Sequence, residues 1–180
     1  MKIVKKIYTP LSDETISALR VGEKVRITGV VYTARDAAHK RVIEMIGRGE
    51  TPPFEFSGQI VYYAGPSPAR PGQAIGAIGP TTSGRMDAYS PALIKLGLKA
   101  MIGKGLRNGE VKRAITEHRG VYFAAIGGAA ALISRSVRKA ELVAFPDLGA
   151  EAIRRLEVGD FPAIVAIDSF GADIYERGNE

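Results

Sequence analysis

The chain has 180 residues, of which 46% are hydrophobic, so it can bury one sizeable core and we expect one domain over residues 1–180. It has no apolar stretch of membrane-spanning length and no signal peptide, which favours a cytoplasmic protein. The net charge of +6 favours anionic partners, but aromatic residues are only 7% and no basic run is interleaved with them, so we do not expect nucleic-acid binding. Because the chain has no cysteine, disulfides, a cysteine nucleophile, thiolate zinc sites and any iron–sulfur cluster ligated by this chain are excluded.

Apolar periodicity predicts strands that alternate with helices along the chain. Strands are expected at residues 5–9, 25–31, 57–63, 74–78, 99–102, 120–126, 141–145 and 161–167. Helices are expected after the caps Ser12 and Asn108, and at residues 38–47, 90–98, 129–134 and 149–157. This alternation favours an α/β domain with a partly parallel sheet.

The first candidate site residues lie where the strand at 25–31 runs into a helix. Since α/β proteins commonly place ligands at such junctions, Arg35 could point at an anion, and Asp36 could orient it or cap the helix. The alternative is that Asp36 only caps the helix, Arg35 is solvated and His39 lies on the helix surface. For His39 we favour this second interpretation.

The second candidate is the stretch Gly79-Pro80-Thr81-Thr82-Ser83-Gly84-Arg85-Met86-Asp87, which follows the apolar run at 74–78. Pro80 cannot continue a central strand, and the hydroxyl residues after it are typical of the start of a helix. Free N–H groups at a helix start attract anions, and Arg85 offers a planar fork that matches a carboxylate. The alternative is an ordinary helix cap with a solvated arginine, and the pattern alone does not choose between them.

The third candidate is Lys104, which stands between Gly103 and Gly105 just after the strand at 99–102. The glycines let the backbone approach a ligand closely, although neither a Walker phosphate loop nor a G-x-G-x-x-G pattern is present, and a lysine in this setting is more often a simple turn residue. All three candidates follow predicted strands. If those strands are parallel and adjacent, the candidates converge at one edge of the sheet.

These motifs together resemble a known family. The stretch 79–87, with Thr33-Ala34-Arg35-Asp36-Ala37-Ala38-His39 before it and Ile102-Gly103-Lys104-Gly105 after it, is similar to the β subunit of class I, iron–sulfur-dependent fumarate hydratase and of L-tartrate dehydratase. In longer relatives this region is the C-terminal domain of a single chain. The resemblance covers nearly the whole sequence, and the position usually occupied by alanine in the threonine motif is Ser83 here.

The resemblance implies a swivelling-type β/β/α domain that completes an active site with a separate α subunit, whose three cysteines hold a [4Fe-4S] cluster. It implies that Arg35, Arg85 and Lys104 hold a dicarboxylate substrate, that Thr81 and Lys104 are catalytic, with Thr81 moving the proton at C3, and that Thr82 lines the pocket. A threonine hydroxyl is a poor base at neutral pH and needs cationic neighbours to act.

We consider three functions, of which the first two follow from the resemblance. The first is reversible hydration of fumarate to (S)-malate with an α subunit, and the second is dehydration of L-tartrate by the same kind of complex. The third is a non-catalytic module that binds an anion or another protein. An apolar surface for the α subunit is expected, with the small-residue helix after Gly127 and Gly128 as one candidate, and a homodimer of β chains is also possible.

Overall fold

A mixed sheet organises the structure, a computed structural model that describes residues 3–125 and 130–177. Its strands are β1 (Lys5–Tyr8), β2 (Lys24–Thr33), β3 (Ile60–Tyr62), β4 (Ala100–Gly103), β5 (Val121–Ala124), β6 (Val137–Ala144) and β7 (Ile153–Ile167). The α-helices are α1 (Asp13–Ser17), α2 (Asp36–Gly47), α3 (Ser90–Lys95), α4 (Gly109–Glu117) and α5 (Ala130–Ser136), and the 3-10 helices are η1 (Ser83–Met86) and η2 (Pro146–Glu151). No helix in this part of the chain is long and apolar enough to cross a membrane.

The strand order is β1-β2-β3-β4-β5-β7-β6, and β2 also pairs with β7. Strands β1 to β5 pair in parallel, whereas β7 runs antiparallel to β2, β5 and β6. Because β7 contacts both β2 and β5, the five strands β2, β3, β4, β5 and β7 close into a ring. The expected α/β architecture with a partly parallel sheet is confirmed.

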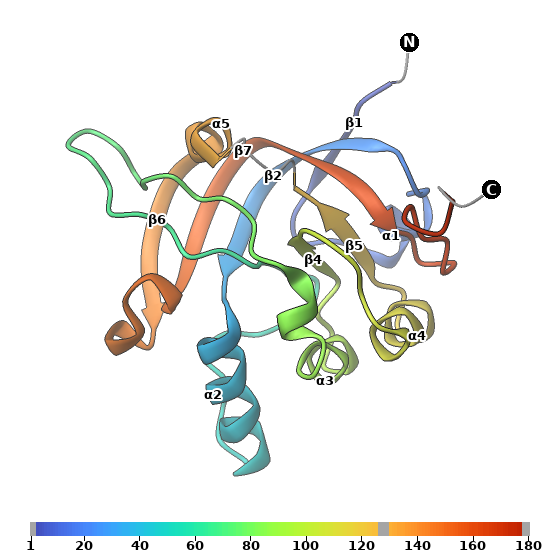
Figure 1. The fold of residues 1–180 in the computed structure, drawn as a ribbon, viewed down its shortest axis with the longest axis horizontal. Helices are drawn as coiled ribbons and strands as arrows, with labels where there is room; N and C mark the ends of the chain where they lie inside the picture. The colour runs from blue at the N-terminus through green and yellow to red at the C-terminus, as the bar shows by residue number, and fades with distance from the viewer. Residues whose placement is uncertain (1–2, 126–129, 178–180) are drawn as a thin grey trace.

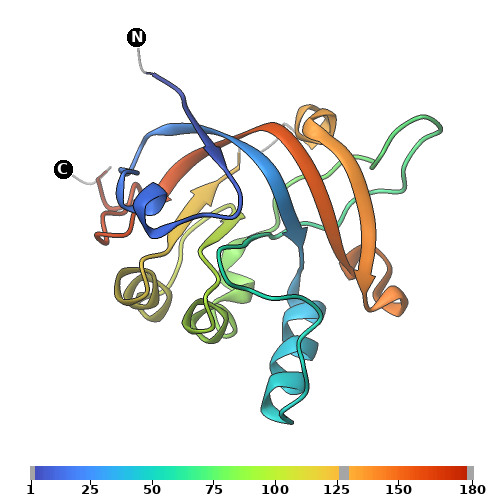
Figure 2. The same cartoon turned by 180° about the vertical axis from the view of Figure 1, so that it is seen from behind.

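Three layers are visible in the ribbon views. The long β2 and β7 arch over β4 and β5, and α2, α3 and α4 lie on the opposite side of these parallel strands (Figures 1 and 2). This order of layers is the β/β/α arrangement that the sequence led us to expect. A loop between β3 and η1 extends outward past β6 and α5 (Figure 1).

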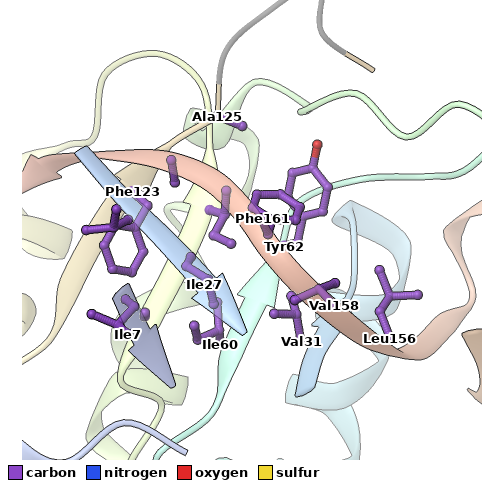
Figure 3. Close-up of a cluster of buried hydrophobic side chains, with 14 of the residues drawn as sticks. Ile7, Ile27, Val31, Ile60, Tyr62, Phe123, Ala125, Leu156, Val158 and Phe161 are labelled. Carbon is purple, nitrogen blue, oxygen red and sulfur yellow. The ribbon is translucent and has the colours of Figure 1, made fainter. Parts of the chain in front are cut away.

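The core has two parts, one on each face of the parallel strands. Inside the ring, Tyr62, Phe123 and Phe161 pack with aliphatic side chains from β1, β2, β3 and β7 (Figure 3). On the outer face, the helices bury a second cluster that includes Tyr63, Met86 and Tyr122. The middle strands β3 and β4 are therefore buried on both faces and hold the strand ends in fixed positions.

Two predicted elements are wrong. Residues 74–78 are not a strand: they belong to the outward loop, where the Ser67 N–H donates to the Ala77 carbonyl at 2.9 Å. Residues 149–157 are not a helix: Gly149 interrupts η2 with φ 58° and ψ −119°, η2 ends at Glu151, and β7 begins at Ile153. Strands β6 and β7 are thus an antiparallel pair joined by η2, and not part of a strand–helix–strand unit.

The side-chain caps predicted at Ser12 and Asn108 are confirmed: Ser12 Oγ accepts from the Thr15 N–H, and Asn108 Oδ1 accepts from the Val111 N–H. The cap considered for Asp36 is wrong, because Asp36 is the first residue of α2 and the N-cap, Arg35, makes no side-chain cap hydrogen bond. The strand predicted at 120–126 is observed over Val121–Ala124, and the helix predicted at 129–134 as Ala130–Ser136. Residues 126–129, which include the proposed Gly127–Gly128 start of that helix, lie outside the described residues.

Candidate functional site

The three candidate segments meet where the adjacent parallel strands β2, β3 and β4 end. Arg35 follows β2 and is the N-cap residue of α2, and Lys104 directly follows β4. Between them, β3 ends at Tyr62, and Tyr63 continues the chain. Because neighbouring parallel strands end at the same edge of a sheet, the observed pairing brings Arg35 and Lys104 to one edge, as predicted. The threonine segment does not follow a strand as predicted, since residues 74–78 are loop, and it reaches this edge through backbone hydrogen bonds of its own.

The threonine segment lies between the ends of β3 and β4. The Thr81 N–H donates to the Tyr63 carbonyl at 2.7 Å, and the Ser83 N–H donates to the Lys104 carbonyl at 2.8 Å. Thr82 and Lys104 form an isolated parallel bridge. Thr81 and Thr82 are therefore held next to Lys104 on a backbone that is hydrogen-bonded on both sides.

The local structure here differs from the expected helix start. Residues Ser83–Met86 form one 3-10 turn of four residues, and the Thr82 side chain does not cap it. A turn this short has little dipole, so an anion site at this position must rely on side chains and not on free helix N–H groups. The reason is local: the segment is fixed by the Tyr63 and Lys104 carbonyls instead of by its own helical hydrogen bonds.

The three candidate cations are only loosely paired. Arg35 Nε lies 3.8 Å from Glu151 Oε1, and Arg85 Nη1 lies 4.0 Å from Asp36 Oδ2. Both distances exceed those of charge-assisted hydrogen bonds, which are about 2.7–2.9 Å. Lys104 is exposed, and within residues 3–125 and 130–177 its ammonium group has no ion pair.

Other cations of the chain are engaged more closely. Arg41 makes two hydrogen bonds to the Asp147 carboxylate at 2.9 and 2.8 Å, and Lys112 Nζ lies 2.7 Å from Asp173 Oδ2. The Arg35 Nε atom, in contrast, is buried without a hydrogen-bond partner among the described residues. N–H donors of these cations therefore remain available at the strand ends, which suits a site that binds a carboxylate or another anion.

Gly65, which follows β3, leaves the space that the Arg35 side chain occupies. A Cβ atom built there would lie 3.2 Å from Arg35 Cδ and 3.0 Å from the Ala150 carbonyl oxygen. A larger residue would therefore push the arginine away from the strand ends. Across the site, the pairing of Asp36 with Arg85 connects the start of α2 to η1.

The expectation for His39 is wrong, because the side chain is 1% exposed and lies inside the protein. Its Nδ1 lies 2.8 Å from the Arg35 carbonyl oxygen, which can only accept, so Nδ1 carries the proton. Nε2 is buried without a partner in the described part of the chain, and the ring packs against Tyr63 and Tyr89. Burial lowers the pKa of His39 from 6.5 to about 4, so the imidazole is neutral at pH 7.

Sequence reasoning missed a buried polar cluster directly beneath the candidate site. At its centre is Arg107, whose side chain is fully buried and whose Nε donates to Asp87 Oδ1 at 2.7 Å. Tyr63, Ser90 and Tyr122 surround the guanidinium. The only signal in the sequence was Asp87 at the end of the threonine stretch, since an arginine in a glycine-rich turn normally indicates a solvated side chain.

The donor set of this chain does not fit an iron–sulfur cluster. The sequence has no cysteine, and the described residues contain no group of three or more His, Cys, Asp or Glu side chains placed to hold a metal ion. What the edge does offer is two guanidinium groups, one ammonium group and two hydroxyls. This combination can bind a dianion and can exchange a proton with it.

Comparison with known proteins gives a family. A family described as "Fumarase C-terminus" matches residues 2–178. Fumarate hydratase 2 of Leishmania major is 39% identical over 166 residues, which are 91% of this chain and 29% of that protein. The anaerobic class I fumarate hydratase of Escherichia coli is 38% identical over 176 residues, which are 97% of this chain and 31% of that protein.

A relative of similar length is also found. A Methanocaldococcus jannaschii protein provisionally named L(+)-tartrate dehydratase subunit beta is 41% identical over 179 residues, which are 96% of this chain and 92% of that protein. The chain therefore spans less than a third of the two fumarate hydratases but nearly all of the tartrate dehydratase subunit. The names of these relatives are those of hydro-lyases. With a match over almost its whole length, this chain belongs to the fumarase C-terminus family.

Proposed function

We propose that this chain is the β subunit of a hydro-lyase that interconverts fumarate and (S)-malate, and that it is active only with a separate α subunit. The observation that carries the proposal is the position of Thr81 and Thr82 between the ends of β3 and β4, next to Lys104. The chain matches 92% of a relative whose name is that of a tartrate dehydratase subunit beta, which supports a partner subunit for this chain.

In this proposal Arg35, Arg85 and Lys104 bind the two carboxylates of the substrate. A dianion that leaves water needs fixed positive charge, and the two guanidinium groups have loosely held donors available for it. Binding of the substrate would draw Arg85 away from Asp36 and Arg35 away from Glu151. Thr82 is bridged to Lys104 through the backbone, and in this proposal its hydroxyl contributes a further hydrogen bond to the substrate.

Hydration of fumarate adds a hydroxyl group to one carbon of the double bond and a proton to the other. We assign the proton transfer at C3 to the Thr81 hydroxyl. In water a threonine hydroxyl is un-ionised at pH 7. The alkoxide that forms when Thr81 gives up its proton is therefore stabilised, in this proposal, by the positive charges of Lys104 and Arg85. Because this chain has no ligands for it, the [4Fe-4S] cluster of the reaction is assigned to the α subunit.

The first test is reconstitution. The chain is purified alone and, separately, together with its α subunit under anaerobic conditions, and fumarate hydration is followed by loss of ultraviolet absorbance. We expect turnover from the complex and none from the isolated chain. Turnover by the isolated, iron-free chain would contradict the proposal.

The second test concerns the substrate-binding cations in the complex. Arg85→Ala removes one guanidinium from the edge, and loss of one partner of a buried charged pair costs about 2–5 kcal/mol, so we expect kcat/KM to fall by at least about 30-fold. The cluster's visible absorption should be unchanged. The matched control is Arg48→Ala, which removes the same charge at the far end of α2, where Arg48 pairs with Glu50. Equal kinetics for the two variants would remove Arg85 from the site.

L-tartrate is a second candidate substrate, because the relative whose length this chain nearly matches is named for it. One extra hydroxyl group distinguishes tartrate from malate. We expect kcat/KM of the complex to be higher for malate than for tartrate. The reverse ratio would assign the chain to a tartrate dehydratase while leaving the roles of Arg35 and Arg85 unchanged.

A further inference from the structure

A buried arginine lies directly beneath the candidate site. Arg107 follows Lys104 by three residues, and its side chain is 0% exposed. Nε donates to Asp87 Oδ1 at 2.7 Å, while Nη2 donates to Ser90 Oγ at 2.8 Å and to Tyr63 Oη at 3.1 Å. The second carboxylate oxygen of Asp87 accepts from the Asn108 N–H at 2.8 Å, so the buried ion pair is almost fully hydrogen-bonded.

The rings of two tyrosines cover this guanidinium. Arg107 Cζ lies 4.9 Å from the ring centre of Tyr122 and 5.2 Å from that of Tyr63. Burial alone lowers the pKa of Arg107, but the tyrosine hydroxyls and the Asp87 carboxylate outweigh it and raise the pKa, so the group stays charged. The charge is thus stabilised by its surroundings and is not available to a ligand.

A second branch of hydrogen bonds runs through Tyr122. Its hydroxyl donates to the Gly105 carbonyl at 2.9 Å, so the contact of 2.8 Å with Ser83 Oγ must have Ser83 as donor. The space around Ser83 is full, since a Cβ atom at Gly103 would clash with its Oγ. Ser83 is therefore held between β4 and β5.

Three members of this cluster lie within two residues of a proposed substrate-contacting residue. Ser83 follows Thr82, Asp87 is two residues after Arg85, and Gly105 follows Lys104. The carbonyl of Tyr63 accepts the Thr81 N–H. One connected set of buried contacts thus joins the two segments that carry Thr81, Thr82, Arg85 and Lys104.

We propose that Arg107, Asp87, Tyr122 and Ser83 are positioning residues, which fix the proposed substrate-contacting side chains relative to one another. This inference rests on the proposed function for what is positioned, but the contacts themselves are independent of it. None of the four touches the substrate. Displacement of a reacting group by about 1 Å can lower the rate on the order of 10²-fold. Residues that hold the reacting groups in place therefore affect kcat in addition to the stability of the fold.

Tyr122→Phe is the main test, because it removes one hydroxyl and keeps the ring over Arg107. In the complex with the α subunit we expect kcat to fall about tenfold as Ser83 and Gly105 each lose a buried partner. KM should change less than kcat, since Arg35 does not depend on this cluster. An unchanged kcat would overturn the proposal.

A matched control separates positioning from simple loss of stability. Asp168→Asn weakens a buried carboxylate that accepts from the Val21, Phe170 and Ala172 N–H groups. Asp168 follows β7, beside the start of β2, and so lies at the opposite end of the strands from the site. We expect Asp168→Asn to lower the free energy of unfolding without lowering kcat. A similar loss of kcat in both variants would mean that the cluster acts only through stability.

A double-mutant cycle tests whether the hydroxyls act as a unit. If Ser83 acts through Tyr122, Ser83→Ala with Tyr122→Phe should lose no more kcat than Tyr122→Phe alone. Fully multiplicative losses would contradict a shared network.

A final measurement does not need activity. In the full chain, hydrogen exchange of the Thr81 and Ser83 N–H groups should become about tenfold faster in Tyr122→Phe, while exchange in α2 stays as in the wild type. If the wild-type complex hydrates no dicarboxylate, the proposed function fails but this measurement still decides whether the segment is held in place. Unchanged exchange at Thr81 and Ser83 would overturn the positioning role itself.

Discussion

Arg85, on η1, and Arg107, three residues after Lys104, place the same side chain in two different settings. Arg107 is fully buried, and its donors face Asp87, Ser90 and Tyr63 at hydrogen-bonding distance. The Arg85 side chain is 57% exposed, and its nearest carboxylate is 4.0 Å away. A guanidinium engaged by buried partners stabilises the protein, whereas an exposed one with a distant partner has donors available for an anion. The same substitution should therefore affect the free energy of unfolding very differently at the two positions.

The largest expected effect is on stability, from Arg107→Met. Removing one partner of a buried ion pair leaves the other charge uncompensated and typically costs about 3–5 kcal/mol, here because Asp87 stays buried. The free energy of unfolding of the chain, measured with urea, should fall by this amount. Arg85→Met is the matched substitution in the exposed setting and should change it by less than about 0.5 kcal/mol.

If instead the two variants were equally stable, the buried cluster would contribute nothing to folding. The distinction between a structural and a binding arginine would then be lost. In the complex, Arg85→Met should lower kcat/KM without lowering the free energy of unfolding. Loss of kcat/KM in Arg107→Met, in contrast, should accompany a large loss of stability.

The next effect is a pH dependence that comes from His39, which lies on the buried side of Arg35. Its pKa is lowered by burial from 6.5 to about 4, and one pKa unit corresponds to about 1.4 kcal/mol. The unfolded chain takes up a proton below pH 6.5, and the folded chain does so only near pH 4. The stabilising effect is therefore complete above pH 6.5 and is lost progressively, by about 3 kcal/mol, as the pH falls to about 4.

His39→Asn tests this prediction while keeping a donor for the Arg35 carbonyl, because the asparagine amide can occupy the place of Nδ1. Urea unfolding is measured for both proteins between pH 7 and pH 4. Carboxylates titrate in both, so their contribution cancels in the difference. The wild type should lose about 3 kcal/mol more than the variant, and parallel curves would mean that water or a charged partner reaches His39.

The strand ends could be predicted from sequence, but the cluster beneath them could not. Residues 25–31 and 99–102 show strong apolar patterns, and the segments after them carry the motif residues, so their convergence followed from parallel pairing. Arg107 gave no such signal, because its partners come from β3, α3, β5 and the segment after η1. Burial by distant segments is a property of the fold and leaves no local periodicity.

The same reason explains the errors in the second half of the chain. Ile153, Leu156 and Val158 have a spacing that is compatible with a helix, and only their pairing with β2 and β6 makes them part of a strand. His39 was misplaced for a related reason: it lies on α2 at the position that faces Tyr63 and Tyr89, and the sequence does not show which face of the helix is covered.

The smallest expected effect concerns Glu151, the loose partner of Arg35. The two side chains are 27% and 33% exposed and 3.8 Å apart, so Glu151→Gln should change the free energy of unfolding by less than about 1 kcal/mol. In the complex, however, the carboxylate competes with the substrate for Arg35, and its removal should lower KM for the dicarboxylate while kcat stays the same. Asp147→Asn is the control, because it removes the same charge from η2 at a position that pairs with Arg41 and not with Arg35. A higher KM in Glu151→Gln alone would mean that Glu151 orients Arg35 for binding, and Arg35 would then resemble the buried Arg107 more than the free Arg85.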